Sequence, residues 1–226
     1  LNLTMDSDFC EEVDNVLDER GINVITDATV TEITGDDKVS GVKLSDGKEI
    51  EADAVIVSVG YTPNSGLAQK AGIKMGERNT IWVDEYMRTD KKDVFAIGDC
   101  VERKSFITRK VSPVMLASTA TSEARIAGAN LYKLQVLRTF TGTIGIFSTR
   151  IGTHAFGCAG LTQTRAEDEN FDIVSGMFET KDRHPGSLPD ASGLKVKLIA
   201  SKKSGIIIGG QVCGSLSAGE IINLIG

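Results

Sequence analysis

Gly98 and Asp99 are the residues whose types and position could most directly bind a ligand. They follow an apolar segment at 94–97 that we predict to be a strand. In an open α/β sheet, ligands bind beyond the carboxyl ends of the strands. Gly98 has no side chain, so a ligand can approach the backbone closely, and the Asp99 carboxylate can accept hydrogen bonds from the hydroxyls of a sugar or polyol. The alternative is an ordinary Gly-Asp turn without a ligand.

Two neighbouring stretches could complete a nucleotide site. Ser112-Pro113 indicates the start of a helix over about 114–132, with Ser112 as its cap and Pro113 at its first position. The N-terminal end of that helix would offer free amides to an anion or to the electron-rich edge of a ring. The apolar segment 54–59 also ends on a glycine, Gly60. This pattern indicates either a crossover between domains without a ligand or close backbone approach to a second nucleotide.

The overall composition argues against several classes of function. The 226 residues are enough for one large domain or two modest ones. The 25 basic and 31 acidic residues give a net charge of −6, which argues against a nucleic-acid-binding protein. The pairs Arg103-Lys104 and Arg109-Lys110 are a local exception, and we interpret them as solvated loops, with a contact to an anionic ligand as the alternative. No apolar run approaches the ~20 residues that a membrane span needs, and we see no signal peptide.

The four cysteines do not form a metal or redox motif. Cys10, Cys100, Cys158 and Cys213 are widely scattered without a C-x-x-C pair, and the chain has two histidines. We therefore expect no metal site and interpret each cysteine as a small buried hydrophobic residue. This usage fits a reducing, cytoplasmic setting.

The N-terminal half predicts a helix and a small meander before the strand at 94–97. Capping residues and an apolar face indicate a helix over 6–20 that Gly21 ends. The apolar run at 54–59 lacks alternation, which is typical of a strand buried on both faces. The other elements that we expect here are antiparallel strands at 22–26, 29–33 and 39–44, a short helix at 65–71 before Gly72, and a strand at 80–83.

From about residue 138 the pattern changes to that of a separate α+β domain, which we assign to residues 136–226. Thr164 and Glu167 could form a capping box for a short helix at 163–169. The strands that we expect in this domain are at 142–148, 153–158, 171–180, 194–200 and 205–213.

The end of the sequence opens another helix. Ser217 and Glu220 are spaced as a capping box, and apolar residues follow them. The chain starts on Leu1 rather than Met and stops about two turns into this helix, so we expect it to be a piece of a longer protein.

Three blocks of sequence resemble the pyridine nucleotide-disulfide oxidoreductase family in their order and spacing. They are DGKEIEADAVIVSVGYTPNSGLAQKAGI, IWVDEYMRTDKKDVFAIGDC and SPVMLASTATSEARIAGANLY. A fourth block, GTIGIFSTRIGTHAFGCAGLTQTRAEDENFDIV, resembles the dimerisation domain of the branch that contains the NADH oxidases and coenzyme A disulfide reductases. The resemblance covers nearly the whole chain.

The resemblance implies a fold class and three domains. The fold would be α/β, with partial FAD- and NAD(P)-binding domains and a small antiparallel meander, followed by an α+β dimerisation domain. Residues 1–60 would be the C-terminal part of the NAD(P)H-binding domain and residues 61–135 the returning part of the FAD-binding domain. Residues 136–226 would be an interface domain, truncated at its C-terminus.

The resemblance also implies roles for particular residues. Asp99 would bind the ribitol hydroxyls of FAD, and Gly98 would let the chain pass close to the dinucleotide. The other residues implied are the amides of Leu116, Ala117 and Ser118 at the pyrimidine edge of the flavin, and Val59 and Gly60 in the channel for NAD(P)H.

The implied activity is that of a homodimeric, FAD-dependent NAD(P)H oxidoreductase, which passes a hydride from NAD(P)H to flavin and on to oxygen or a disulfide. The dimer would form through residues 136–226. The sequence departs from the family because it contains neither a G-x-G-x-x-G fingerprint nor a cysteine at the position of the redox cysteine. We therefore expect no catalytic residue in this chain, no activity of the chain in isolation, and a missing N-terminal segment of the same protein as its partner.

Two alternatives stay open from the sequence. The chain could be a non-catalytic dimerisation fragment, or it could belong to another flavoenzyme branch, such as a ferredoxin or rubredoxin reductase, although the region 142–174 argues against that branch. The apolar strands at 54–59 and 94–97 would normally pair with strands that this sequence lacks. Unless another segment completes their sheet, these strands should be rearranged or left with exposed edges.

Overall fold

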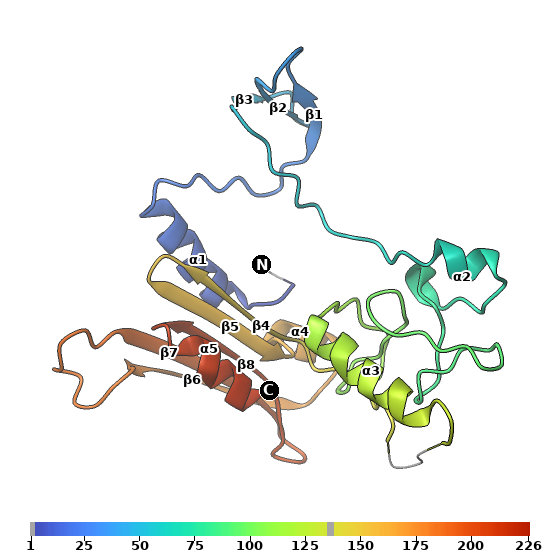
Figure 1. Ribbon diagram of the computed structural model, residues 1–226. Helices are drawn as coiled ribbons and strands as arrows, with labels where there is room; N and C mark the ends of the chain where they lie inside the picture. The colour runs from blue at the N-terminus through green and yellow to red at the C-terminus, as the bar shows by residue number, and fades with distance from the viewer. Residues whose placement is uncertain (1–2, 135–137) are drawn as a thin grey trace. The chain divides into compact units, whose positions relative to one another are not determined.

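The structure, a computed structural model, describes residues 3–134 and 138–226 (Figure 1). The chain divides into two compact units. Unit 1 comprises Leu1–Val16 and Thr62–Gly226, and unit 2 comprises Leu17–Tyr61. The mixture of helices and antiparallel sheets confirms the predicted combination of an α/β part with an α+β domain.

A five-stranded antiparallel sheet forms the main core of unit 1, and its spatial order is β4-β5-β8-β7-β6 (Figure 1). The register places Val196 opposite Val212 on one face of the sheet and Phe156 opposite Cys213 on the other, so apolar side chains of neighbouring strands pair on both faces. All five strands that the sequence predicts after residue 138 are confirmed, with ends that shift by a few residues. Their bounds are Ile146–Ile151 for β4, His154–Gly160 for β5, Ile173–Lys181 for β6, Gly193–Ser201 for β7 and Ile207–Gly214 for β8.

Helix α5, Ala218–Ile225, covers one face of this sheet. Ile222 is fully buried there, and burial of such a side chain contributes about 1.5–3 kcal/mol. A Cβ at Gly157 would lie 2.9 Å from Ile222, so a glycine is needed for the helix to approach β5 this closely. The buried residues of this cluster are Ala155, Ala159, Leu194, Val212, Ala218 and Ile222.

The helix predicted at the end of the sequence is therefore confirmed, but its predicted capping box is wrong. Ser217 is the residue before the first turn, yet it lies in a helical conformation with φ −67° and ψ −11°, and its side chain caps nothing. Its carbonyl oxygen accepts a hydrogen bond from the amide of Glu220 at 3.0 Å. A capping side chain needs an extended residue at this position, and Ser217 is not extended.

Helix α4, Gln163–Asp168, confirms the short helix predicted at 163–169, but its capping box is also wrong. The cap is Thr162, whose extended backbone lets its hydroxyl accept a hydrogen bond from the amide three residues later at 3.1 Å. Thr164 lies inside the first turn and donates its hydroxyl to Asp6 instead, at 3.1 Å. Glu167 accepts from the side chain of Gln163.

Helix α1, Ser7–Asp18, confirms the helix predicted at 6–20, and Gly21 follows it with φ +69°. Its apolar face carries Phe9, Val13 and Val16, all buried. Residues 7–16 of this helix belong to the same compact unit as the five-stranded sheet.

Asp6, directly before α1, joins that helix to the sheet and to α4. Its amide donates to Gln211 on β8 at 2.7 Å. Its carboxylate accepts from the amides of Gln163 and Thr164 at 3.0 and 3.2 Å, and it lies 3.0 Å from the Nζ of Lys197 on β7. Asp6 and Gln211 are both buried, so this is a buried polar junction whose charges and hydrogen-bonding groups are paired.

Unit 2 contains a small antiparallel sheet with the order β1-β2-β3. The strands are β1, Val30–Thr34, β2, Gly41–Leu44, and β3, Glu49–Glu51. The predicted meander and its strands at 29–33 and 39–44 are confirmed. β3 was not predicted, and the segment 22–26, which was predicted as a strand, forms none.

The apolar segment at 54–59 is not a strand, and the prediction that it is buried on both faces is wrong. Ile56 and Val59 are 92% and 90% exposed. The cause is the lack of neighbours, because the backbone of a strand needs a partner to complete its hydrogen bonds, and among the described residues none pairs with it. The sequence pattern is that of a strand inside a larger sheet.

The two strands predicted at 80–83 and 94–97 are reduced to isolated bridges. Ile81 pairs with Val101 in parallel, and Phe95 pairs with Arg88. The strand predictions are therefore wrong for the described residues, although both segments keep an extended path.

Two helices complete unit 1, together with a short 3₁₀ helix at Glu77–Asn79. α2, Gly66–Lys70, confirms the helix predicted at 65–71. α3, Ala117–Asn130, confirms the long small-residue helix but starts later than predicted, because Leu116 is extended with φ −132° and ψ 136°. Ser112 and Pro113 do not cap it. The hydroxyl of Ser112 accepts a local hydrogen bond from the amide of Val114 at 3.4 Å.

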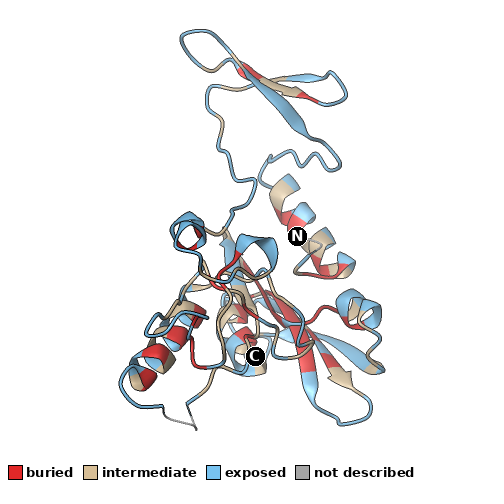
Figure 2. Cartoon of the chain, turned by 90° about the vertical axis from the view of Figure 1, so that its right-hand side faces the viewer, coloured by how far each residue is buried: buried red, intermediate tan, exposed pale blue. Residues whose placement is uncertain are grey.

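Buried residues gather on the five-stranded sheet and on the inner faces of α1, α3 and α5, while the three-stranded sheet is mostly exposed (Figure 2). Among the residues that the structure describes, no helix has both the length and the apolar composition for a membrane span.

The junction at Asp6 predicts a dependence of stability on pH. Burial disfavours the charged carboxylate, but the hydrogen bonds from Gln163, Thr164, Lys197 and Gln211 outweigh that effect and lower the pKa of Asp6. A lowered pKa in the folded state means that Asp6 stabilises the fold above its unfolded pKa of about 3.9, and that this contribution is lost as the pH falls through the folded pKa.

We expect Asp6→Asn to lower the free energy of unfolding at pH 7 by about 3 kcal/mol, because it breaks a buried pair. The difference from the unsubstituted chain should shrink below about pH 4. Urea denaturation at both pH values measures it. Asp8→Asn is the matched control, because it removes a more exposed carboxylate that lies 3.4 Å from the Nζ of Lys197. It should lower the free energy of unfolding by less than about 1 kcal/mol. Equal effects of the two substitutions at pH 7 would contradict the junction.

Candidate functional site

The backbone at Gly98 adopts a conformation that favours glycine. Its φ is +84°, and the amide of Val101 donates to its carbonyl at 3.1 Å to close a turn. A Cβ built on Gly98 would meet nothing within 4 Å, so the space in front of this residue is open. The backbone at Gly98 therefore has room for the close approach of another group.

The carboxylate of Asp99 faces solvent beside this open space. Its side chain is 61% exposed. One oxygen, Oδ1, accepts a hydrogen bond from Nη1 of Arg103 at 3.3 Å. The other oxygen accepts none from the described residues, so it is free to accept from the hydroxyl groups of a ligand.

Arg103 is buried, and the interpretation of this residue as part of a solvated loop is wrong. Its side chain is 2% exposed and forms two parallel hydrogen bonds to Glu123 on α3, from Nε at 2.6 Å and from Nη2 at 3.2 Å. Burial disfavours the charge of Arg103, but Glu123 and Asp99 outweigh it and raise the pKa of the guanidinium. The neighbouring Lys104 is exposed, in agreement with the prediction.

The second basic pair is on the surface, as expected. Arg109 lies over the ring of Phe106 at 4.9 Å, and Lys110 pairs with Glu169. Both side chains remain exposed.

Glu123 contacts the candidate site, and sequence reasoning missed it. It is fully buried, and its Oε2 also accepts the amide hydrogen of Gly98 at 2.8 Å. The signal that could have found it is its spacing, because it lies four residues from both Thr119 and Ala127, which are buried on the same face of α3. A carboxylate at such a position needs a cationic partner.

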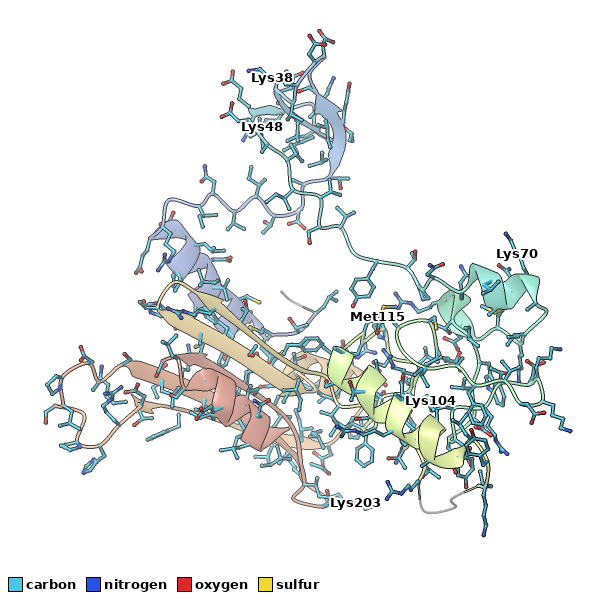
Figure 3. The ribbon with its side chains drawn as sticks, in the orientation of Figure 1. Lys38, Lys48, Lys70, Lys104, Met115 and Lys203 are labelled. Atoms are coloured by element: carbon cyan, nitrogen blue, oxygen red, sulfur yellow. The ribbon has the colours of Figure 1, made fainter. Side chains whose placement is uncertain are left out.

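The N-terminal end of α3 offers unpaired backbone amides. The first turn has no side-chain cap, and the first amides of a helix have no partner within the helix. Ala117 and Ser118 are exposed there, and Met115, labelled in Figure 3, lies directly before this end. These donors suit an anion or an electron-rich ring edge.

Arg103 connects this helix end to the Gly98 turn. Its Nη1 donates both to Asp99 and to the carbonyl of Val114, at 2.9 Å for the latter. The structure therefore joins Gly98 and Asp99 to the segment that leads into Leu116, Ala117 and Ser118.

A cavity of about 300 Å³ lies beside the first turn of α3. This volume is at the lower limit for a small-molecule pocket, so it could hold one ring system but not a whole dinucleotide. Neither Gly98 nor Asp99 lines this cavity. The cavity is lined by Phe106, Ser118, Thr119, Ser122, Phe140, Gly142, Thr143 and Ile144.

Val59 and Gly60, the predicted residues of the second nucleotide channel, belong to unit 2. Both are exposed and lie outside any strand. Gly60 has φ +102°, and a Cβ there would meet nothing within 4 Å. The local backbone thus has the glycine conformation and open space that close approach of a ligand requires.

The cysteines do not provide a reactive thiolate. Cys158 and Cys213 are buried, which confirms the prediction for these two, and burial raises their pKa values to about 11 and about 12. Cys10 and Cys100 are partly exposed, and burial of their thiols raises their pKa values as well. A nucleophilic cysteine needs a lowered pKa. Among the described residues no group of three His, Cys, Asp or Glu side chains could hold a metal ion.

Two family models match this chain. The model of the pyridine nucleotide-disulphide oxidoreductases matches residues 1–124, and the model of the dimerisation domain of the same enzymes matches residues 147–226. The second match covers β5 to β8, α5 and all of β4 except Ile146.

Known proteins similar to the chain are oxidoreductases. An NAD(P)H sulfur oxidoreductase (CoA-dependent) from Pyrococcus abyssi is 30% identical over 92% of this chain and 46% of that protein. An NADH oxidase from Methanocaldococcus jannaschii is 31% identical over 97% of this chain and 48% of that protein. The chain thus spans about half the length of the curated relatives that it matches.

Solved structures show the same fold. The structure of an NAD-dependent persulfide reductase from A. fulgidus superposes with a TM-score of 0.90 and 34% identity, over 99% of this chain and 41% of that one. A water-forming NADH oxidase from Lactobacillus brevis, bound to NADH, superposes with a TM-score of 0.88 at 22% identity, over all of this chain and 49% of that one.

Proposed function

The chain belongs to the pyridine nucleotide-disulphide oxidoreductase family, and on that premise we propose that the whole protein is an FAD-dependent NAD(P)H oxidoreductase. It would be of the NADH oxidase or coenzyme A disulfide reductase type. The names of two relatives support this branch, one an NADH oxidase and the other a CoA-dependent NAD(P)H sulfur oxidoreductase. We propose that the chain is inactive by itself, because its sequence contains neither a G-x-G-x-x-G fingerprint nor a cysteine at the position of the family's redox cysteine.

The observation that supports an FAD site most strongly is the open turn at Gly98 and Asp99. A free carboxylate oxygen beside a backbone without a side chain suits the hydroxyls of the FAD ribitol. We propose that Asp99 accepts these hydrogen bonds and that Gly98 allows the dinucleotide to approach. Val59 and Gly60 would line the channel for NAD(P)H.

The chemistry that FAD supplies when bound is acceptance of a hydride from NAD(P)H and transfer of electrons to oxygen or to a disulfide. The residues of this chain would bind the flavin and stabilise charge on it. The amides of Leu116, Ala117 and Ser118 would face the pyrimidine edge of the flavin, and the positive end of α3 would stabilise negative charge that develops there. This effect would favour the reduced flavin.

The partners of the chain follow from the same proposal. We propose that residues 136–226 form a homodimer interface, which the match to a dimerisation domain supports. The N-terminal segment of the same protein would complete the sheet beside 54–59 and 94–97. We place the whole protein in the cytoplasm, because its scattered cysteines suit a reducing compartment.

Asp99→Ala in the whole protein should weaken FAD binding by about tenfold or more, because it removes a hydrogen-bonding charged group worth roughly 1.5–3 kcal/mol. The flavin absorbance that remains after exhaustive dialysis measures the loss. Asp172→Ala, which removes a carboxylate that is 74% exposed outside this turn, is the control and should retain the flavin. Full flavin content in Asp99→Ala would refute the role of Asp99.

The dimer proposal predicts the mass of the particle. In sedimentation equilibrium at micromolar concentrations, the whole protein should have twice the mass of one full-length polypeptide. A protein that remains monomeric at all of these concentrations would contradict the assignment.

A further inference from the structure

The buried ion pair between Arg103 and Glu123 is not among the proposed contacts to the cofactors, but Glu123 binds the amide of Gly98 in the turn. The two side chains are 2% and 0% exposed. Removing two charges from water is costly, and well-packed apolar residues of similar size often stabilise a protein equally well. Stability alone therefore does not account for an ion pair at this place.

The hydrogen bonds of the pair show what it organises. Glu123 accepts the amide hydrogen of Gly98 at 2.8 Å, which fixes the backbone of the turn. Arg103 donates to Asp99 at 3.3 Å and to the carbonyl of Val114 at 2.9 Å. The bidentate contact between the two side chains permits little rotation of either group.

We propose that Arg103 and Glu123 are positioning residues for FAD, which hold the Asp99 carboxylate and the N-terminal end of α3 in their binding geometry before the flavin arrives. This inference rests on the proposed function of Asp99. Neither residue needs to touch the flavin, since both act through the turn and through Asp99. A site that is already ordered loses less conformational entropy when its ligand binds.

Both charged side chains are needed to hold the Gly98 turn and the Asp99 carboxylate in place. An apolar pair could fill the same volume, but it could neither accept the Gly98 amide hydrogen nor orient the Asp99 carboxylate. Replacing both residues by apolar ones therefore removes the hydrogen bonds to the turn while it keeps the packing. No buried charge is left without a partner to destabilise the fold.

The test is a double-mutant cycle in the whole protein after removal of its flavin. Four proteins are compared: the unsubstituted form, Asp99→Ala, the pair variant Arg103→Met with Glu123→Leu, and the combination of all three changes. FAD affinity is measured by quenching of flavin fluorescence, and thermal unfolding of the flavin-free proteins is recorded alongside. The matched control is Lys202→Gln with Asp172→Asn, which removes an exposed pair with a 2.8 Å contact.

We expect the pair variant to bind FAD about tenfold more weakly while it unfolds within a few degrees of the unsubstituted protein. The combined loss of affinity should be smaller than the product of the two separate losses, because Arg103 and Glu123 act partly through Asp99. The control should bind FAD normally. Unchanged affinity in the pair variant, or losses that multiply in the combination, would overturn the proposal.

The outcomes also separate this inference from the proposed function. An unsubstituted protein that binds no FAD would refute both. Weakened binding in Asp99→Ala together with normal binding in the pair variant would refute only the positioning role. If the pair variant does not fold, Glu123→Gln replaces it, since this change keeps the shape but removes the charge. A normal affinity in Glu123→Gln would then overturn the proposal, and restored binding in Glu123→Asp relative to Glu123→Gln would support it.

Discussion

The candidate site depends on one buried interaction, the ion pair between Arg103 and Glu123. The attraction between two buried charges repays their loss of hydration only when each has further partners. Here the guanidinium also binds Asp99 and the carbonyl of Val114, and the carboxylate also binds the amide of Gly98. The turn, the segment before α3 and α3 itself are therefore fixed to one another by directional bonds. Packing alone would allow each of them to shift.

The sequence predicts those parts of the fold whose partners are in the same chain. The strands of the large sheet pair with one another, as Val196 does with Val212, so alternation and turn residues were sufficient to find them. The segment 54–59 has the composition of a buried strand but no partner among the described residues, and Ile56 is therefore exposed. The apolar pattern of this segment is typical of a strand that pairs with neighbours inside a larger sheet. The predicted capping boxes are wrong because two residue types three positions apart do not determine which residue has an extended backbone.

The residues of the candidate site could likewise be predicted only where their signal lies in the local sequence. Gly98 and Asp99 could be found because an apolar segment followed by a glycine and an acid is a local signal. Arg103 could not, since an arginine beside a lysine resembles a surface pair, and only the fold brings it to Glu123, twenty positions later. The junction at Asp6 is a further case, because its partner Gln211 is 205 positions away. That junction attaches the start of α1 to the sheet of the dimerisation domain.

Hydrogen exchange of the Gly98 amide in the flavin-free 226-residue chain tests most directly whether the turn is ordered before a ligand binds. A backbone amide that is bonded to a buried carboxylate exchanges only when the local structure opens. The account predicts slow exchange at Gly98 by NMR, and fast exchange at the same amide in Glu123→Gln. Exchange at Gly98 as fast as in an unfolded chain would show that the ion pair does not hold the turn, and would contradict the account.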